Sequence, residues 1–565
     1  MNAPERTNTE KNNLIPFNLA DFYKTGHPPM YPRETKKLVA NFTPRSDKYA
    51  PVLPGLFDHK VVWFGLQGFI QEYLIDVFNN EFFNKPQQLA VRKYQRRMDT
   101  ALGPNVVPVD SLEALHQLGY LPLEIRSLPE GSRVDIKVPP VLFISTNEQF
   151  PWIATYFETL FSCENWKPST VATIAFEFRK LLTYFARMTG APEDFVAWQG
   201  HDFSMRGMSG VHDAMRCGAA HLLSFNGTDT IPAIDYLEDF YGADAEKELV
   251  GGSIPASEHS VMALRILLTQ QRLAHDPANA DKDEKALRRL AELEIMREFV
   301  SQDYPSGMVS IVSDTFDFWN VITVIAKALK PEILARKQDA LGNAKVVFRP
   351  DSGDPVLILT GYTDDEITRQ ADGSYVVRAS GERITEAERK GAVECLWDIF
   401  GGTTTSKGFR VLDSHVGLIY GDSITLQRAL SILQRLAAKD FASCNVVFGI
   451  GSFTYNMLTR DNFGWAMKAI YAQVGDEAVE IYKDPATDNG TKKSARGLLR
   501  VEREGDKFVL YERQTEEEAN GGALVPVFRD SKMLLNQSLA DIRQRLQDSW
   551  ICPEPGSVVW NSAVE

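Results

Sequence analysis

Long apolar runs, paired cysteines and an excess of positive charge are all missing from this chain of 565 residues. No apolar stretch reaches the roughly 20 residues that cross a bilayer. The polar start MNAPERTNTEKNN also lacks the apolar segment of a secretory signal. The five cysteines form no CxxC pair, which is typical of a reducing compartment. We therefore expect a cytoplasmic protein with no membrane partner.

The charge balance argues against polyanionic partners. Lys plus Arg number 61 against 75 Asp plus Glu, a formal charge of -14, so nonspecific attraction to nucleic acid is disfavoured. Any anionic ligand must be drawn in by local clusters of cations. Zinc hydrolase chemistry is also disfavoured, because the sequence has no HExxH motif and no other tight spacing of metal ligands.

Changes in the hydrophobic pattern along the chain predict three parts. Residues 1–170 mix strand-like runs with helical spacing, which indicates an α+β part. Residues 171–484 mostly repeat a short apolar strand, a polar cluster and a helix, the pattern of a βα-barrel. Residues 485–565 return to mixed strands and helices, and we expect them to pack on the N-terminal part.

Two segments interrupt the barrel pattern. The segment from about 270 to 300 is rich in both charge signs and has apolar residues at helical spacing, which predicts a solvated amphipathic helix. The segment from about 365 to 385 carries Asp-Gly between β-rich runs, which predicts a hairpin that leaves the barrel.

A glycine-bearing loop is the first candidate for phosphate binding. Gly449, Gly451 and Ser452 follow an apolar strand and precede a helical stretch. Backbone N–H groups in such a loop can approach phosphate closely. In a βα-barrel the carboxyl ends of the strands form the active-site face, where this loop would lie. Taken alone, the segment is equally well an ordinary βα turn.

Carboxylates at two further strand ends are suited to a sugar. RPDSGDP offers Arg349, Asp351 and Asp354, and YGDS offers Asp422. Carboxylates accept hydrogen bonds from hydroxyl groups and can share a divalent cation with phosphates. Each Asp could instead form a turn or cap, but together at strand ends they favour a phosphosugar site.

Two other motifs are suited to a flat ring bearing an amide. HDFSMRG places Phe203 near Arg206, and this pair could hold a ring and a phosphate at once. A core histidine and a surface arginine explain the motif equally well. NGTDT adds Asp229, which could accept hydrogen bonds from an amide but would repel a carboxylate ligand.

A histidine at an expected helix start is a candidate acid, base or nucleophile. PASEHS places Glu258 beside His259, and a carboxylate on one ring nitrogen would fix the tautomer. Adjacent residues need not bond one another, so Asp314 in SDTFD is a second candidate for that carboxylate. A purely structural histidine is the alternative.

In this order the motifs resemble those of the nicotinamide phosphoribosyltransferase family, a branch of the type II phosphoribosyltransferases. The resemblance extends from about residue 20 to 500, and several dispersed loops in one order are more specific than any single loop. The matching strings are DFYKTGHPPMYP, FGLQGFI, HDFSMRG, NGTDT, SIPASEHS, SIVSDTFD, RPDSGDP, YGDS, FGIGS with MLTRD, and YKDP.

The resemblance implies an irregular βα-barrel with an α+β domain formed by the N-terminal and C-terminal segments. It implies a homodimer with shared active sites that transfers the phosphoribosyl group of phosphoribosyl pyrophosphate to nicotinamide in NAD salvage. It also implies Mg²⁺ and ATP as cofactors, with ATP phosphorylating His259 transiently.

The resemblance further implies roles for matched positions. The nicotinamide would be bound by Phe203, Asp229, Arg349 and the partner subunit's Tyr23. The phosphoribosyl 5-phosphate would be bound by Arg206, Gly421, Asp422, Gly451 and Ser452. The pyrophosphate would be bound by Arg45, Arg460, Lys468 and Lys483. Catalytic roles would fall to His259, Glu258, Asp314 and Asp351, the last of which would hold the ribose.

Some positions depart from the family's usual pattern. Phe22 stands where the family has Ser, Ser204 and Met205 stand where it has Gly-Tyr, and Ser452 replaces a common glycine. The last change exchanges a close backbone approach for a hydroxyl contact. These departures bear on binding strength more than on reaction type.

Three rival functions are compatible with parts of the same pattern. A nicotinate phosphoribosyltransferase is the nearest, but Asp229 would face its carboxylate at a cost of roughly 1 to 4 kcal/mol at effective dielectrics of about 80 to 20. A noncatalytic nucleotide-binding protein could lose His259 and Asp351 without penalty, yet both are present. A phosphosugar isomerase or aldolase is the third, and no obvious Schiff-base lysine stands at a strand end.

Overall fold

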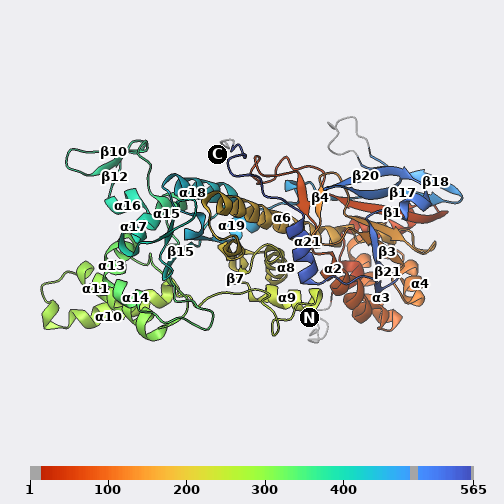
Figure 1. Cartoon of the computed structure of the whole chain (residues 1–565). Helices are drawn as coiled ribbons and strands as arrows, with labels where there is room; N and C mark the ends of the chain where they lie inside the picture. Colours follow the sequence, from red (N-terminus) through yellow and green to blue (C-terminus); the bar gives the residue numbers. More distant parts are fainter. Residues whose placement is uncertain (1–13, 484–493, 561–565) are drawn as a thin grey trace, which may run out of the picture.

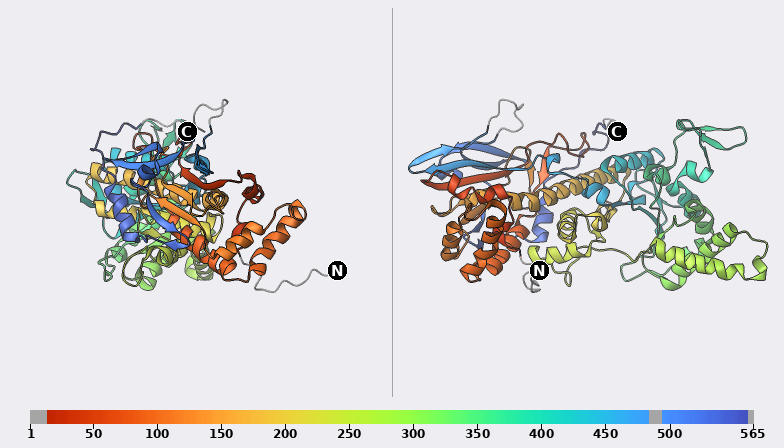
Figure 2. Two further views of the ribbon diagram at one scale, coloured as in Figure 1. Left: turned by 90° about the vertical axis from the view of Figure 1, so that its right-hand side faces the viewer. Right: turned by 180° about the vertical axis from the view of Figure 1, so that it is seen from behind.

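The computed structural model describes residues 14–483 and 494–560, which form an elongated molecule with two parts (Figure 1). One part is built on a seven-stranded antiparallel sheet, and the other on a six-stranded parallel sheet. The helix α6 (Glu158–Thr189) runs from one part to the other, as the view from behind in Figure 2 shows. Residue 170 therefore falls inside a continuous helix.

The antiparallel sheet combines strands from both ends of the chain, as expected from the resemblance. Its order is β18-β17-β1-β5-β3-β21-β22. The strands are β1 (Thr35–Thr43), β3 (Leu123–Ser127), β5 (Val141–Ser145), β17 (Ala466–Val474), β18 (Glu477–Glu480), β21 (Val525–Arg529) and β22 (Lys532–Met533). Because β17 pairs along the whole of β1, the chain returns to the N-terminal part at Ala466, earlier than residue 485.

Aromatic packing holds this part together. The rings of Phe42 and Trp465 stack with centroids 5.0 Å apart, which fastens β1 to the start of the returning chain. Phe17 lies buried among other aromatic rings near the chain start. Short strands and helices complete this part: β2 (Lys60–Val62), β4 (Arg133–Asp135), α2 (Leu66–Phe69), α3 (Gln87–Leu102), α4 (Asp110–Leu118), β19 (Leu498–Glu504) and β20 (Lys507–Gln514).

The parallel sheet curls into a barrel, which confirms the predicted fold class. Its order is β7-β6-β16-β15-β9-β8, and its strands are β6 (Gly200–Asp202), β7 (Gly227–Thr228), β8 (Val309–Val312), β9 (Val346–Arg349), β15 (Val416–Tyr420) and β16 (Val446–Ile450). Segment 252–256 bridges the two edges, because Gly252 pairs with Gly227 of β7 and Ala256 pairs with Ser310 of β8. The ring of backbone is thereby closed.

Helices between the strands cover the outside of the barrel. They include α8 (Val211–His221), α9 (Ile231–Tyr241), α15 (Pro355–Thr360), α17 (Ala392–Phe400) and α18 (Leu426–Ala438). Helix α18 shows why these sequences become helices: the Thr425 hydroxyl caps its first turn, and its apolar residues recur at helical spacing on one buried face. Helices α8 and α18, for example, return the chain to the next parallel strands, β7 and β16.

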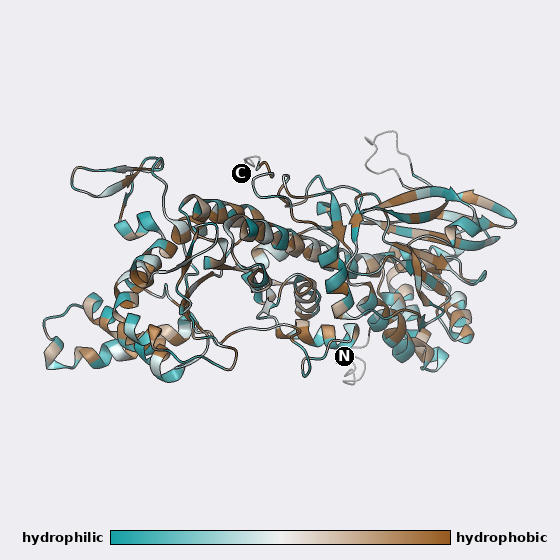
Figure 3. Cartoon of the chain, in the orientation of Figure 1, coloured by the Kyte–Doolittle hydropathy of each residue, from teal (hydrophilic) through white to brown (hydrophobic). Residues whose placement is uncertain are grey.

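Both interruptions of the barrel project from it. The charged segment contains the end of α10 (His259–Ala274), a short turn and α11 (Glu284–Glu298), so two packed helices replace the single expected helix. Both carry mixed hydrophilic and hydrophobic residues in Figure 3. The expected hairpin is confirmed as the small sheet β10 (Ile367–Arg369), β11 (Tyr375–Val377) and β12 (Arg383–Ile384).

Within the described ranges, no helix combines the length and apolar character needed to cross a membrane. The cysteines in the same ranges are all free thiols.

The C-terminal helix α21 (Leu539–Asp548) is tied to the barrel by one arginine. Arg543 donates to the carbonyls of Leu222 and Val250 at 2.8 and 2.7 Å, and burial lowers its pKa to about 10. Arg543→Ala would leave both carbonyls unpaired, at about 1 to 3 kcal/mol each. We expect calorimetry to show a Tm at least about 2 °C lower. The exposed Arg503→Ala is the control, and equal Tm values for the two variants would contradict this account.

Candidate active site

The parallel sheet brings most of the predicted site residues to one edge of the barrel. They follow the carboxyl ends of six strands that run side by side in register. The residues at or just beyond these ends are Phe203, Asp229, Asp314, Arg349, Asp351, Gly421, Asp422, Gly451 and Ser452. Residues up to about 250 positions apart in the sequence come close together in space, because parallel strands end at the same edge of the sheet.

Asp229 is held by two donors at the β6–β7 edge. Its Oδ1 accepts from His201 Nε2 at 2.9 Å and from Ser253 Oγ at 2.6 Å. Burial alone would raise the pKa of Asp229, but these hydrogen bonds and the charge of Arg349 hold it below its ordinary value. Phe203 lies next to this pair, with its ring 4.7 Å from that of His201. An anionic acceptor beside an aromatic plate is suited to a flat ring bearing an amide.

His259 is the first residue of α10 and bonds to Asp314, not to the adjacent Glu258. Its Nε2 lies 3.0 Å from Asp314 Oδ1, whereas the Glu258 carboxylate accepts from the hydroxyl of Ser260. The His259 side chain is 51% exposed while Asp314 is 4% exposed. An oriented imidazole therefore presents its other nitrogen to an incoming group.

Asp314 also organises the loop after β9. Its Oδ2 accepts from the backbone N–H of Asp351 at 2.9 Å and from Ser352 Oγ at 2.6 Å. Although burial acts to raise it, the pKa of Asp314 is lowered by these bonds and by His259. One carboxylate thus joins the histidine to the loop that carries Asp351.

Asp351 is a partly exposed acceptor with spare hydrogen-bonding capacity. Its Oδ2 lies 3.4 Å from Arg349 Nε, while its buried Oδ1 has no hydrogen-bond partner among the described residues. Burial raises the pKa of Asp351, and the carboxylates of Asp314 and Asp422 add to that effect against Arg349. The side chain as a whole is 29% exposed, so the carboxylate can accept a hydrogen bond from a sugar hydroxyl.

The Asp351 carboxylate leaves no room for a side chain at Gly421. A Cβ at position 421 would stand 2.3 Å from Asp351 Oδ1, and a Cβ at Gly449 would stand 2.5 Å from the ring of Phe203. At both positions the glycine backbone therefore packs directly against a side chain of the site. Asp354, by contrast, caps α15 by accepting from the backbone N–H groups of Val356 and Leu357, which was the alternative for that residue.

The glycine loop after β16 is open to a ligand. A Cβ at Gly451 would meet no atom within 4 Å, whereas a Cβ at Gly207 would lie 2.1 Å from Ser452 Oγ. Ser452 opens the short helix α19 (Ser452–Tyr455). Arg206 is exposed on the neighbouring turn, and Asp422 is exposed after β15. These groups surround a space suited to a phosphate monoester.

A buried lysine, which sequence reasoning missed, fixes the Arg206 turn. Lys167 Nζ contacts Asp213 Oδ2 at 2.6 Å and Asn456 Oδ1 at 2.8 Å. Asn456 in turn donates to the carbonyl of Gly207 at 2.9 Å. Ser253 and Ser257 were also missed; the carbonyl of Ser257 accepts from Arg349 at 2.7 Å. The strand-like GSIP run before PASEHS was the available signal for these serines.

The predicted pyrophosphate ligands lie on the antiparallel part. Lys468 is on β17, and its pKa is lowered by burial and by the charges of Arg45, Lys483 and Lys24. These cations therefore share one region, and Arg45 with Lys468 lines a cavity of about 260 Å³. In Figure 1 the β1–β17 pair stands far from β15 of the barrel.

Tyr23 and Arg460 complete this second group. The ring of Tyr23 is 57% exposed, and its pKa is raised by burial and by Glu158 and Asp21, against Arg460. Arg460 is exposed at the start of a short 3₁₀ turn. The predicted residues thus fall into two sets on one chain, one on the barrel and one on the antiparallel part.

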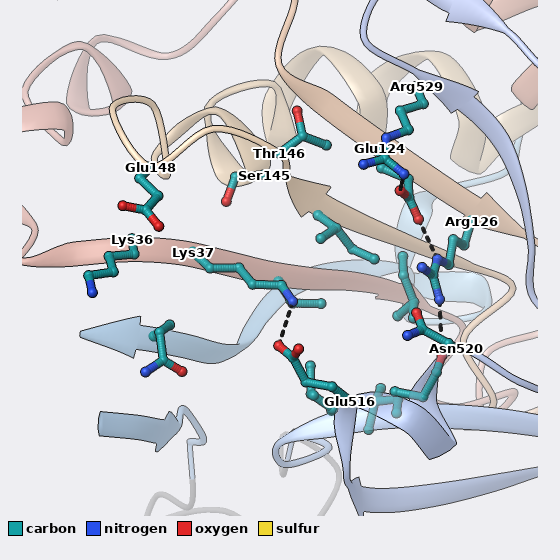
Figure 4. A pocket seen from close by; sticks show the side chains of 17 residues that line it. Lys36, Lys37, Glu124, Arg126, Ser145, Thr146, Glu148, Glu516, Asn520 and Arg529 are labelled. Carbon is teal, nitrogen blue, oxygen red and sulfur yellow. Dashed lines mark hydrogen bonds and ion pairs between the residues drawn. The ribbon is translucent and has the colours of Figure 1, made fainter. Parts of the chain in front are cut away.

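A cavity of about 460 Å³ on the antiparallel sheet contains none of the predicted residues (Figure 4). Its charges are largely paired with one another: Lys37 with Glu516 at 2.8 Å, and Arg529 with Glu124 at 3.2 Å. Such pairing leaves little charge for a ligand.

The described residues include no group of three or more His, Cys, Asp or Glu side chains placed to hold a metal. Asp351 and Asp422 are close enough to influence one another electrostatically. Mg²⁺ usually takes one or two protein carboxylates and shares the remaining positions with phosphate and water. These two carboxylates fit that pattern.

Comparison with known proteins identifies relatives along most of the chain. Residues 198–529 match the model of the nicotinate phosphoribosyltransferase family. A nicotinamide phosphoribosyltransferase of Acinetobacter baylyi is 51% identical over 533 residues, which cover 94% of this chain and 97% of the relative. One from Xanthomonas campestris is 30% identical over 535 residues, covering 93% and 96%.

Solved structures share the fold. A nicotinate-nucleotide pyrophosphorylase from Pyrococcus furiosus superposes with a TM-score of 0.52 at 12% identity and covers 96% of this chain and 97% of its own. Human nicotinic acid phosphoribosyltransferase superposes with a TM-score of 0.50 at 14% identity, with coverage of 94% and 93%. These likenesses confirm the architecture.

The Lys167 network yields a local prediction. Lys167→Met would leave the partly buried Asp213 without its cation and would remove one of the two donors to Asn456 Oδ1, at a cost of about 1 to 3 kcal/mol. We expect the amides of residues 205–209 to exchange with deuterium at least about tenfold faster, because the turn opens locally. The exposed Lys507→Met serves as the control. Unchanged protection of the turn in Lys167→Met would show that the network does not hold it.

Proposed function

Since this chain belongs to the nicotinate phosphoribosyltransferase family, we propose that it transfers the phosphoribosyl group of phosphoribosyl pyrophosphate to nicotinamide. The products are nicotinamide mononucleotide and pyrophosphate, a step of NAD biosynthesis. The choice of base is supported by Asp229, an anionic acceptor bonded to the His201 ring that packs against Phe203. The relative that is 51% identical carries the same activity in its name.

The transfer itself follows from the geometry of the barrel edge. The ring nitrogen of nicotinamide attacks the anomeric carbon of the ribose while the bond from that carbon to pyrophosphate breaks. Asp351, whose side chain is 29% exposed, accepts hydrogen bonds from the ribose hydroxyls, and nearby carboxylates stabilise the positive charge that develops on the sugar. Asp351 and Asp422 would hold Mg²⁺, which when bound would offset the negative charge of the departing pyrophosphate. No protein nucleophile is required.

Nicotinate is the alternative base, and the family name includes it. Its carboxylate would meet Asp229, whose pKa is held below the ordinary value, so both groups would be charged at neutral pH. Contact between two such charges costs roughly 1 to 4 kcal/mol at effective dielectrics of about 80 to 20. This repulsion favours the amide.

ATP coupling through His259 is the second element of the proposal. If the neutral ring donates Nε2–H to Asp314, Nδ1 carries the lone pair and can attack the γ-phosphorus of ATP. The N–P bond forms as the bond to the bridging oxygen breaks and ADP leaves. Water then cleaves the phosphohistidine and releases phosphate, and coupling this loss to transfer would favour nucleotide synthesis. Asp314 stabilises the ring charge throughout.

A homodimer with shared sites is the third element. The barrel edge of one chain offers Arg206 and Arg349 as its predicted cations, whereas the predicted pyrophosphate ligands lie on the antiparallel part. A second copy that placed its antiparallel part over this barrel edge would bring Arg45, Lys468 and Lys483 to the leaving group. The exposed ring of Tyr23 would then close over the base.

Base selection is tested at Asp229. We expect Asp229→Ser to raise the KM for nicotinamide and to shift the ratio of kcat/KM for nicotinamide over nicotinate toward nicotinate by at least about fivefold, because the like-charge repulsion is gone. Product nucleotides are separated by chromatography. A ratio equal to that of the unmodified protein would show that Asp229 does not select the base.

Coupling is tested at His259. In His259→Ala, stimulation of nucleotide formation by ATP should disappear while some basal transfer from phosphoribosyl pyrophosphate remains, because no phosphohistidine can form. The exposed His275→Ala, at the end of the same helix, is the control. Undiminished ATP stimulation in His259→Ala would remove the phosphohistidine from the mechanism.

A further inference from the structure

We propose that His201 is a positioning residue that, with Ser253, sets the preference for nicotinamide by fixing the orientation of the Asp229 carboxylate, so that its free oxygen faces the base. The inference rests on the proposed function, since it assumes that Asp229 receives the carboxamide. It assigns a part in base selection to two residues that are not themselves expected to touch the reacting atoms.

The His201 ring is held in place by the register of two strands. His201 of β6 pairs with Gly227 of β7, which places Asp229 two residues beyond its cross-strand neighbour. A Cβ at Gly227 would lie 2.6 Å from His201 Nδ1, so the ring occupies the space that any larger residue would need. Phe203 contacts the ring on another side. The side chain is accordingly only 12% exposed.

Both donors act on the same carboxylate oxygen. The 2.9 Å bond from His201 and the 2.6 Å bond from Ser253 end on Asp229 Oδ1. The Asp229 side chain is 47% exposed, and its Oδ2 has no hydrogen-bond partner among the described residues. A carboxamide N–H can therefore be received at Oδ2, while Oδ1 is already saturated by the protein.

This arrangement gives the imidazole a defined state. Because the ionised carboxylate only accepts hydrogen bonds, Nε2 must carry a proton. Ser253 arrives from segment 252–256, which closes the barrel between β7 and β8. The two donors thus approach from opposite neighbours of β7, and rotation of the Asp229 carboxylate would break both bonds at once.

The matched variants are His201→Phe and His201→Gln. Phe keeps a flat ring against Gly227 and Phe203 but has no donor, whereas the Gln amide can place an N–H near the position of Nε2. Ser253→Ala removes the second donor alone. Steady-state kcat and KM are measured with nicotinamide and with nicotinate at fixed phosphoribosyl pyrophosphate and Mg²⁺. Asp229→Ser and the unmodified protein are measured in parallel.

We expect His201→Phe to raise the KM for nicotinamide about tenfold or more, as loss of a hydrogen bond to a charged group predicts. Its kcat should change less than about threefold, and its selectivity should move toward that of Asp229→Ser. His201→Gln should restore KM to within about threefold of the unmodified protein. Ser253→Ala should shift KM in the same direction as His201→Phe.

The inference is overturned if His201→Phe has the same KM and selectivity as the unmodified protein while Asp229→Ser changes the selectivity. A fall in kcat for both bases at unchanged KM, with no rescue by Gln, would also overturn it, because that pattern indicates a general structural role. Failure of the proposed function has a separate signature: the unmodified protein would then make no nucleotide from nicotinamide.

Discussion

Closure of the parallel sheet by segment 252–256 is the constraint on which the site depends. The bridges Gly227–Gly252 and Ala256–Ser310 join the two edge strands, so every strand end faces one common space. The same segment delivers Ser253 to Asp229 and the Ser257 carbonyl to Arg349, and it leads directly into α10, which begins with His259. The segment that closes the barrel backbone therefore also places these functional groups.

Charge is distributed unevenly in this acidic chain. Asp229, Asp314 and Asp351 lie at the barrel edge, and hydrogen bonds hold the pKa of the first two below the ordinary value while burial raises that of the third. The carboxylates of this edge can accept hydrogen bonds from an amide, a histidine ring and sugar hydroxyls. By itself, the edge is not suited to the anionic pyrophosphate. The cations grouped on the antiparallel part complement it, which is the basis for the proposal that a second copy completes the site.

Much of the fold could be predicted from the sequence because βα repeats and polar strand ends are local patterns. The hairpin near 365–385 and the cap at Asp354 belong to this class. Pairings that depend on register could not be predicted: the His201–Asp229 bond requires the alignment of β6 with β7, and the choice of Asp314 over Glu258 requires the turn at the start of α10. The return of the chain at Ala466 was likewise hidden, since β17 is identified by its pairing with β1.

The proposed function requires that this barrel edge select an amide over an acid. The most direct measurement is the ratio of kcat/KM for nicotinamide to that for nicotinate in the unmodified protein, with phosphoribosyl pyrophosphate and Mg²⁺ and with or without ATP. A ratio well above one, with nicotinamide mononucleotide as the product, is the predicted result. A ratio below one would contradict the role of Asp229 and make nicotinate the substrate.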